Sequence, residues 1–514
     1  MDFTSAKLLR NRFSHLILYG VAGIILFIPI INKYFVSDDF IVLKRVCFDK
    51  TLWIQGFFRP LSDCSLYLNY LLGGFNPTGY NLLNILVHSI NSYLLFIFCS
   101  KWQWVTEHHL QRSYAVMASV LFLTYPFHNE AIVWTLGRGA SLASTFGIGA
   151  LIIVVSGWNI KSKVFAASLC YLIGLMAYES IIMLPLLIFI LLIQQKTSSR
   201  EYFIWTLCLL ITCIVYLLLR YYLSGAIFGA YGEGLLKTTW TNYPANVLKV
   251  MGRLIIPPIK NSNLFLIISV VVGLITISVV LIIFIKLRKR IYNKYFTLRL
   301  LSMFGCALVV PFLFAVSTRT SEGDRLLYFP SFFLCCYISF LLVRCIKKKS
   351  IRQIVFFCIL LYNIVFLQLN NLNWFRAGVA THSIMQILKS DAVTNKIFIA
   401  NLPNEINGAY IFRTGFKEAL LINRIDTTKV VVLNRLSKEV SITLSGILKP
   451  IHKQSKLFIP PSLEIKTYGD ASADNIKKPG ITYFTLPVAS KLYYWNRYRF
   501  VLLDIIPKGL DMEP

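Results

Sequence analysis

Residues 13–39 read FSHLILYGVAGIILFIPIINKYFVSDD. The apolar part of this stretch is close to the roughly 20 residues that a helix needs to span a bilayer. Its basic amino-terminal flank is typical of a signal peptide, but no small-residue cleavage site follows, so we expect a retained anchor. Two adjacent carboxylates, Asp38 and Asp39, lie a few residues beyond it. Negative charge at a membrane boundary is costly and points to a functional site; the alternative is a solvated loop that ends the helix.

The chain as a whole is strongly apolar. Of its 514 residues, 56% are hydrophobic and 15% are charged, and the mean hydropathy is +0.64. A soluble domain carries about 25% charged residues. Long apolar runs predict about eleven transmembrane helices, at residues 13–31, 80–100, 112–126, 139–157, 164–178, 180–194, 202–223, 262–285, 300–317, 326–345 and 352–370. The sequence therefore predicts a mainly α, polytopic membrane protein.

Basic residues mark one side of the predicted helices. With the amino terminus inside, Lys and Arg gather on the inner loops, above all at residues 286–299 and 344–352, as the positive-inside rule requires. Most acids of the membrane part lie on the outer loops. Basic loops that face anionic lipid account for much of the net charge of +29, and we find no nucleic-acid-binding motif. We therefore expect membrane lipids, and no nucleic acid, as partners.

The character of the sequence changes after residue 371. Apolar runs shorten, and β-forming segments alternate with turn residues, at 396–400, 429–433, 440–444, 457–460, 481–486 and 499–505, with a short helix expected within 408–423. An odd number of spans places this part outside. We divide the chain into a membrane domain, residues 1–371, and a small β-rich extracytoplasmic domain, residues 372–514. Cys47 and Cys64 share the first outer loop and could form a disulfide there.

That first outer loop, residues 32–79, carries further polar groups. Arg59 precedes an amphipathic stretch, residues 62–72, that could lie in the membrane interface. The span that follows carries a polar stripe on one helical face, formed by Asn81, Asn84, His88 and Asn91. Interhelical hydrogen bonding is the favoured explanation of this stripe, and His88 lining a site is the alternative.

Charged residues also flank the later spans. The second outer loop contains His128, Glu130 and Arg138, and charge so close to hydrocarbon points to function. His128 with Glu130 could bind a metal, although protein metal sites usually have three or four ligands. Glu179 lies in a tight turn between two spans, where helix capping and a place in a site are equally good explanations.

A late outer loop reads STRTSEGDRLLYFP at residues 317–330. It places Arg319 and Arg325 near Glu322 and Asp324 at the mouth of a span. Because the planar fork of Arg suits a phosphate, the group is a candidate anion clamp; the alternative is a structural ion pair between two helices. Carboxylates and arginines that lie together at the outer ends of the spans suit a reaction between a membrane-buried phosphate ester and a molecule that arrives from outside.

In their order along the chain, these motifs resemble the GT-C superfamily of glycosyltransferases, specifically the transmembrane O-mannosyltransferase branch that includes the TMTC proteins. The resemblance covers roughly residues 10–345 and is carried by Asp38-Asp39, Arg59-Pro60-Leu61, residues 79–84 with His88, residues 126–131 with Gly137-Arg138, Tyr178-Glu179, and residues 324–331. There are two departures. The tetratricopeptide repeats of the eukaryotic proteins are replaced by the β-rich tail, and the usual Glu-Arg before Leu-Tyr is Asp324-Arg325 here.

The resemblance implies a GT-C-like fold and an inverting transfer of a monosaccharide, with mannose as one candidate, from polyprenyl phosphate to an acceptor hydroxyl. Asp38 would be the catalytic base, with Asp39 or Glu130 orienting the acceptor. The candidate ligands of the donor phosphate are Arg138, Arg319 and Arg325, and the other site-lining candidates are Arg59, His88, His128, Glu179, Glu322 and Asp324. A metal is not required where arginines supply positive charge, although a divalent ion between Asp38, Asp39 and Glu130 is an alternative.

The predicted partners are a lipid-linked sugar donor and a protein or glycan acceptor. The predicted location is a bacterial inner membrane, with the amino terminus cytoplasmic and the carboxy-terminal domain extracytoplasmic. A transporter or flippase and a polymerase of lipid-linked saccharides are the alternative functions. The glycosyltransferase hypothesis requires that Asp38, Glu130 and Arg325 converge in a single extracytoplasmic cavity that is open to lipid.

Overall fold

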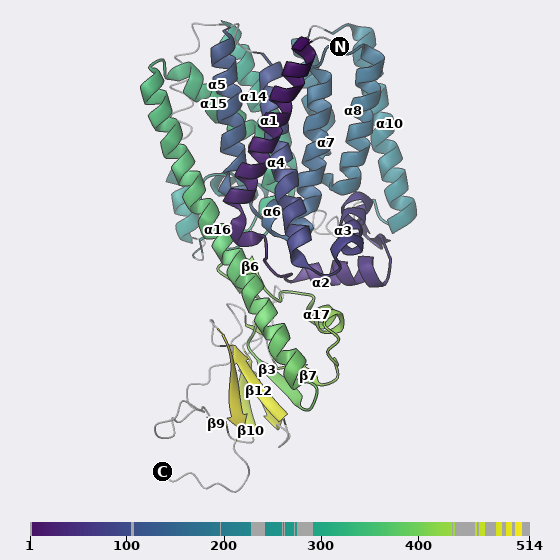
Figure 1. Ribbon diagram of the computed structural model, residues 1–514, viewed down its shortest axis with the longest axis vertical. Helices are drawn as coiled ribbons and strands as arrows, with labels where there is room; N and C mark the ends of the chain where they lie inside the picture. The colour runs from purple at the N-terminus through teal and green to yellow at the C-terminus, as the bar shows by residue number, and fades with distance from the viewer. Residues whose placement is uncertain are drawn as a thin grey trace. The chain divides into compact units, whose positions relative to one another are not determined.

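A computed structural model shows a largely helical protein with a small carboxy-terminal sheet (Figure 1). It divides into a helical unit, Met1–Asn32 with Arg45–Leu372, and a C-terminal unit, Lys33–Lys44 with Asn373–Pro514. The structure describes residues 3–103, 107–195, 197–227, 242–259, 261, 263–271, 273–274, 291–433, 435–436, 458–459, 462–467, 480–485, 490–495 and 499–505.

Long helices form most of the helical unit, and many of them run side by side in Figure 1. Helix α7 packs against α8 and α4, and α5 packs against α4 and α15. The longer helices are α1 (Phe3–Leu26), α4 (Pro77–Lys101), α5 (His108–Leu123), α7 (Arg138–Val154), α8 (Ile160–Ala177), α9 (Leu184–Gln194), α10 (Ser199–Ser224), α12 (Asn242–Arg253), α14 (Ile291–Phe314), α15 (Tyr328–Cys345) and α16 (Lys349–Asp391).

Within the described residues, seven helical segments are long and apolar enough to cross a membrane. They coincide with seven of the eleven predicted spans. The predicted spans 13–31 and 180–194 correspond to the shorter apolar helices Ser14–Leu26 and Glu179–Ile193, and 112–126 corresponds to α5, which has only 16 residues. Most of the predicted span 262–285 lies outside the described residues. The chain is therefore an integral membrane protein with several spans, and seven of the eleven predicted spans are long and apolar enough to cross a membrane in the part that the structure describes.

Helix α16 is 43 residues long, about twice the length of a membrane span. The prediction ended this span at residue 370, where the hydropathy falls. The backbone stays helical to Asp391 because polar residues such as Gln and Asn end an apolar run without ending a helix. The division between the two units, at Leu372 and Asn373, falls within this helix.

Short elements connect α1 to α4. They are α2 (Asp38–Leu43), a π-helical turn (Lys44–Phe48), a two-stranded ribbon of β1 (Trp53–Ile54) and β2 (Phe57–Phe58), and α3 (Pro60–Gly73). Helix α3 covers the amphipathic stretch at 62–72; its place in the membrane interface stays a prediction. Cys47 and Cys64 are both free, so the suggested disulfide is absent.

The polar stripe on α4 is buried and bonded to other segments. All four of its side chains are fully buried. Asn81 donates to the Ile31 carbonyl (3.1 Å), Asn84 donates to the Ile132 carbonyl (3.0 Å), His88 bonds to the Tyr328 hydroxyl (2.8 Å), and Asn91 donates to the Ser141 carbonyl (2.8 Å). These bonds are the interhelical contacts that the favoured explanation predicts, and they tie α4 to its neighbours in a region where water is scarce.

The C-terminal unit contains a five-stranded mixed sheet in the order β7-β3-β12-β13-β9. The strands are β3 (Lys396–Ala400), β7 (Val430–Val432), β9 (Phe458–Ile459), β12 (Ser490–Trp495) and β13 (Phe500–Ile505). Strand β12 lies parallel to β3 and antiparallel to β13. The short helix α17 (Phe416–Ile422) falls within the predicted range. The prediction missed β12 and β10 (Ser462–Thr467), which pairs with β11 (Gly480–Thr485), and the predicted strand 440–444 lies outside the described residues.

Candidate functional site

The two adjacent carboxylates open helix α2 and have different surroundings. Asp39 is fully buried, and its Oδ2 accepts a hydrogen bond from the backbone N–H of Val36 at 3.0 Å. Such a bond satisfies a backbone donor ahead of the helix. The Asp38 side chain is 28% exposed. Burial lowers the pKa of the nearby Lys33 amine, and the charge of Asp39 partly opposes that shift. Asp38 is the more exposed carboxylate of the pair.

Within the helical unit, Glu130 and Arg325 form an ion pair. The guanidinium of Arg325 donates to Oε1 of Glu130 at 2.5 Å, and the backbone N–H of Arg325 donates to Oε2 at 2.9 Å. Glu130 is fully buried, whereas the Arg325 side chain is 14% exposed. The guanidinium also lies 5.1 Å from the ring centroid of Trp134. Both carboxylate oxygens are thus engaged by one residue, an arrangement that fixes Arg325 in place.

Tyr178 connects this pair to a second group of charges. Arg325 Nε donates to the Tyr178 hydroxyl at 3.2 Å, and the Arg59 guanidinium lies 4.3 Å from the centroid of the same ring. Arg59 Nε donates in turn to Glu179 at 3.1 Å, and Arg220 donates to the other oxygen of Glu179. We call the group formed by Arg59, Glu130, Tyr178, Glu179, Arg220 and Arg325 the arginine network. It joins side chains from the loops or ends of five segments far apart in the sequence.

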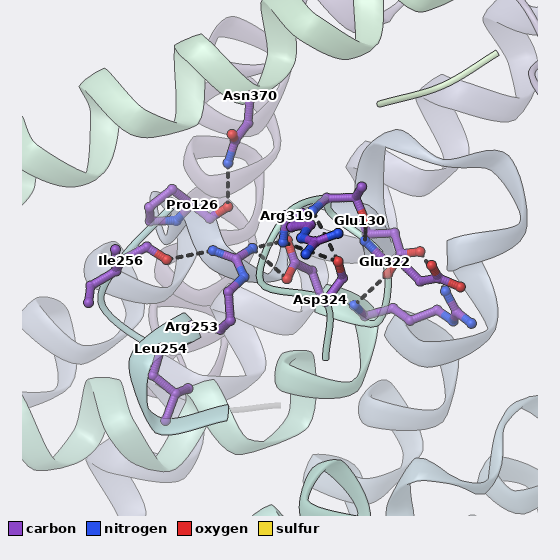
Figure 2. Close-up of polar contacts among 12 residues, drawn as sticks. Pro126, Glu130, Arg253, Leu254, Ile256, Arg319, Glu322, Asp324 and Asn370 are labelled. Atoms are coloured by element: carbon purple, nitrogen blue, oxygen red, sulfur yellow. Dashed lines mark hydrogen bonds and ion pairs between the residues drawn. The ribbon is translucent and has the colours of Figure 1, made fainter. Parts of the chain in front are cut away.

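Asp324 does not pair with its neighbour Arg325. Figure 2 shows the Arg253 guanidinium between Asp324 and the Ile256 carbonyl. One Arg253 nitrogen donates to both oxygens of Asp324 at 2.6 Å, and the other donates to the Ile256 carbonyl at 2.5 Å. The Arg253 and Asp324 side chains are 0% and 2% exposed. Asp324 therefore takes part in a structural ion pair, which was the alternative to its place in an anion clamp.

Arg138 is fully buried at the start of α7. Its guanidinium donates to four neutral acceptors: Asn84 Oδ1 (2.6 Å), Asn69 Oδ1 (2.6 Å), the Tyr80 carbonyl (2.9 Å) and the Ser65 carbonyl (3.1 Å). The preceding Gly137 allows this placement, since a Cβ there would lie 2.1 Å from the Glu130 carbonyl oxygen. A phosphate could reach Arg138 only by displacing these acceptors, and its role as a donor ligand stays a prediction.

The other predicted site residues are scattered around this region. Arg319 and Glu322 are exposed on the loop that precedes Asp324 (Figure 2). His128 is fully buried and its Nδ1 bonds to the Ser331 hydroxyl at 2.8 Å. Burial, and secondarily the neighbouring His88, lowers the pKa of His128 well below its usual value.

The metal alternatives find no support in the described part of the chain. Across those residues, no group of three or more His, Cys, Asp or Glu side chains is placed to hold a metal ion. Whether Asp38 converges with Glu130 and Arg325 stays a prediction, because the first belongs to the C-terminal unit and the others to the helical unit.

Sequence reasoning missed two arginines of this region. Arg220 lies near the end of the apolar helix α10 and Arg253 closes α12. A charged residue inside an apolar run was a usable signal for Arg220. Arg253 also lies between apolar residues, at 250–251 and 254–256, but its acidic partner is 71 residues away, so nothing local identified the pair.

Comparison with proteins of known function finds partial relatives. The chain is 34% identical over 95 residues to the human protein O-mannosyl-transferase TMTC3, which is 18% of this chain and 10% of that protein. It is 38% identical over 91 residues to Tmtc1 of Drosophila melanogaster, again 18% and 10%. A protein O-mannosyl-transferase of Caenorhabditis elegans is 27% identical over 154 residues, 30% of this chain and 21% of that protein.

The resemblance to the TMTC O-mannosyltransferases is confirmed. The matched segments span only about a tenth to a fifth of the length of these relatives. No family model matches the chain. Among solved structures, ArnT from Cupriavidus metallidurans aligns at 11% identity, with a TM-score of 0.45 for the form bound to undecaprenyl phosphate and 0.47 for the apo form. The two alignments cover 81% and 82% of this chain, and 89% and 86% of the ArnT chains.

Proposed function

We propose that this protein is a membrane glycosyltransferase that moves a monosaccharide from a polyprenyl phosphate carrier to an acceptor hydroxyl, with inversion at the anomeric carbon. The observation that carries the proposal is the segment shared with the O-mannosyltransferases. A partly exposed carboxylate beside a buried one, and arginines at the ends of apolar helices, supply the chemical groups that such a reaction needs.

Asp38 is our candidate for the general base. A base must be within reach of the acceptor hydroxyl and must lie on the face opposite the leaving phosphate. The partial exposure of Asp38 supports the first condition. Asp39 is buried and accepts a hydrogen bond from the Val36 N–H, so its role is to stabilise the turn that carries Asp38.

The arginine network is our candidate for the site of the donor phosphate. Arg59 lies against the ring of Tyr178 and Arg325 donates to its hydroxyl, and the two arginine side chains are 25% and 14% exposed. Glu130, which is fully buried, accepts from Arg325, and Glu179 accepts from Arg59. With Arg220 the network has three positive charges and two negative ones, so it has a net attraction for the charge that develops on a departing phosphate.

The sugar and the acceptor are finer points of the proposal. The relatives are named O-mannosyl-transferases, and we propose mannose as the first sugar to test. We propose a protein or glycan hydroxyl as the acceptor, on the extracytoplasmic side of a bacterial inner membrane.

The test is a transfer assay with the full chain in lipid nanodiscs. Labelled polyprenyl phosphate mannose and the corresponding glucose and arabinose donors are each supplied with mixed peptide and glycan acceptors, and free polyprenyl phosphate is measured with the labelled product. We expect release of free carrier with at least one donor. In a parallel experiment with the same protein in sealed proteoliposomes, movement of intact donor across the membrane without release of free carrier would contradict the proposal and favour a transporter.

Replacing Arg325 with Lys should raise the KM for the donor about tenfold, equivalent to about 1.4 kcal/mol. Lys keeps the positive charge near Glu130 but loses the planar fork that can donate two bonds to a phosphate. The measurement is the donor dependence of the initial rate. Arg200→Lys, an exposed position at the start of α10, is the matched control and should be silent; an unchanged donor KM in Arg325→Lys would count against this phosphate site.

A further inference from the structure

The loop that carries the two adjacent carboxylates belongs to the C-terminal unit. Residues Lys33–Lys44 group with Asn373–Pro514 rather than with the helices that precede and follow them in the sequence. Within this unit the aromatic rings of Phe40 and Phe412 stack, with centroids 6.2 Å apart. Both rings are fully buried. The carboxylate loop therefore shares its apolar core with residues about 370 positions further along the chain.

The backbone of this loop is held by the segment 411–415. The Ser37 N–H donates to the Ile411 carbonyl at 2.7 Å. The Thr414 N–H donates to the Ser37 hydroxyl at 3.3 Å. Ser37 has a φ of +49°, a strained conformation for a non-glycine residue that persists only where the surrounding structure imposes it. These bonds from the C-terminal unit are the contacts that hold Ser37 in that conformation, immediately before Asp38.

The same segment also contacts the Asp38 carboxylate directly. The Thr414 hydroxyl donates to Oδ1 of Asp38. An Arg413 guanidinium nitrogen lies 3.7 Å from Oδ2. Each oxygen of the carboxylate thus has a partner on the segment, while the carboxylate stays 28% exposed.

Gly415 explains how the segment approaches so closely. Its φ is +74°, and a Cβ at this position would lie 2.4 Å from the Ser37 carbonyl oxygen and 3.2 Å from the Ser37 carbonyl carbon. Both atoms are backbone atoms and cannot rotate away. Any side chain at 415 must therefore push the carboxylate loop out of its position.

We propose that residues 411–415 of the C-terminal unit position the catalytic carboxylate Asp38, with Thr414 and Arg413 as positioning residues and Gly415 as the contact point. The C-terminal unit is then a structural part of the catalytic centre. This inference rests on the proposed function, in which Asp38 is the base.

The first test measures the contact without reference to activity. Hydrogen exchange of residues 33–44 is followed by mass spectrometry in the full chain and in Gly415→Ala, Thr414→Val and Thr428→Val. Thr428 donates to Asp426 at 2.7 Å in an exposed turn of the same unit, so Thr428→Val removes a comparable hydroxyl elsewhere. We expect at least about tenfold faster exchange in this loop for Gly415→Ala, a smaller increase for Thr414→Val, and none for the control. Unchanged exchange in Gly415→Ala would overturn the inference.

The second test uses the transfer reaction. A displacement of about 1 Å at a reacting group can lower a rate by about a hundredfold. Thr414→Val should therefore lower kcat at least about tenfold while the KM for the donor stays the same, and Thr414→Ser should restore it because Ser keeps the hydroxyl. Equal kcat values for wild type and Thr414→Val would overturn the positioning role. If wild type itself transfers no sugar, the proposed function fails, and the exchange experiment still decides whether the contact exists.

Discussion

Asp38→Asn should lower the rate of sugar transfer by a factor of about 10²–10⁴, the usual contribution of a general base. Asn has nearly the same shape as Asp and can still accept the hydrogen bond from the Thr414 hydroxyl, so the fold should be retained. It cannot take a proton from the acceptor hydroxyl. The KM for the donor should be unchanged, because the substitution removes a group that acts on the acceptor.

The matched control is Asp49→Asn, an exposed acid in the same connecting region. It should transfer at the wild-type rate. Asp39→Asn should also impair transfer, but for a different reason, because it weakens the bond to the Val36 N–H that shapes the turn. Its melting temperature should fall, unlike that of Asp38→Asn. A fully active Asp38→Asn would show that the base is elsewhere.

Asp324→Asn should cost about 3–5 kcal/mol of stability, because it leaves the cation of Arg253 buried without a counter-charge. The Arg253 side chain is 0% exposed, and both of its contacts with Asp324 are 2.6 Å long. The measurement is the midpoint of unfolding in detergent. Glu322→Gln removes an exposed acid from the same loop and should leave the midpoint unchanged.

A double variant separates the loss of a charge pair from the loss of packing. Replacing a buried ion pair with apolar residues of similar volume is often neutral or stabilising. Arg253→Met combined with Asp324→Leu should therefore recover most of the stability that Asp324→Asn loses. If the double variant is as unstable as Asp324→Asn, the buried charge is not the cause.

Much of the helical architecture was predictable because the signal for a membrane span is local. A helix satisfies its own backbone hydrogen bonds, so a run of apolar residues is enough to identify a span. Segments such as Pro77–Lys101 and Ser199–Ser224 were found in this way. The extension of α16 to Asp391 was not found, because hydropathy reports where an apolar run ends and not where a helix ends.

Strand β12 shows a different limit. Its sequence, SKLYYW at residues 490–495, is short and lies near segments with stronger β signals. It is nevertheless the middle strand of the five, paired with β3 on one side and β13 on the other. Pairing partners decide the place of a strand in a sheet, and one segment read in isolation does not reveal them.

The candidate site was also predictable only in part from the sequence. Charged residues next to apolar runs are rare and costly, so Asp38, Glu130, Glu179 and Arg325 were identifiable from the printed sequence. Their partners were not. Arg325 pairs with Glu130, 195 positions away, Asp324 pairs with Arg253, and the carboxylate loop is held by residues 411–415. Local composition identifies charged side chains whose place next to hydrocarbon is energetically costly and therefore points to a function. Contacts between distant segments form only when the chain folds, and they decide which partner each of these side chains binds.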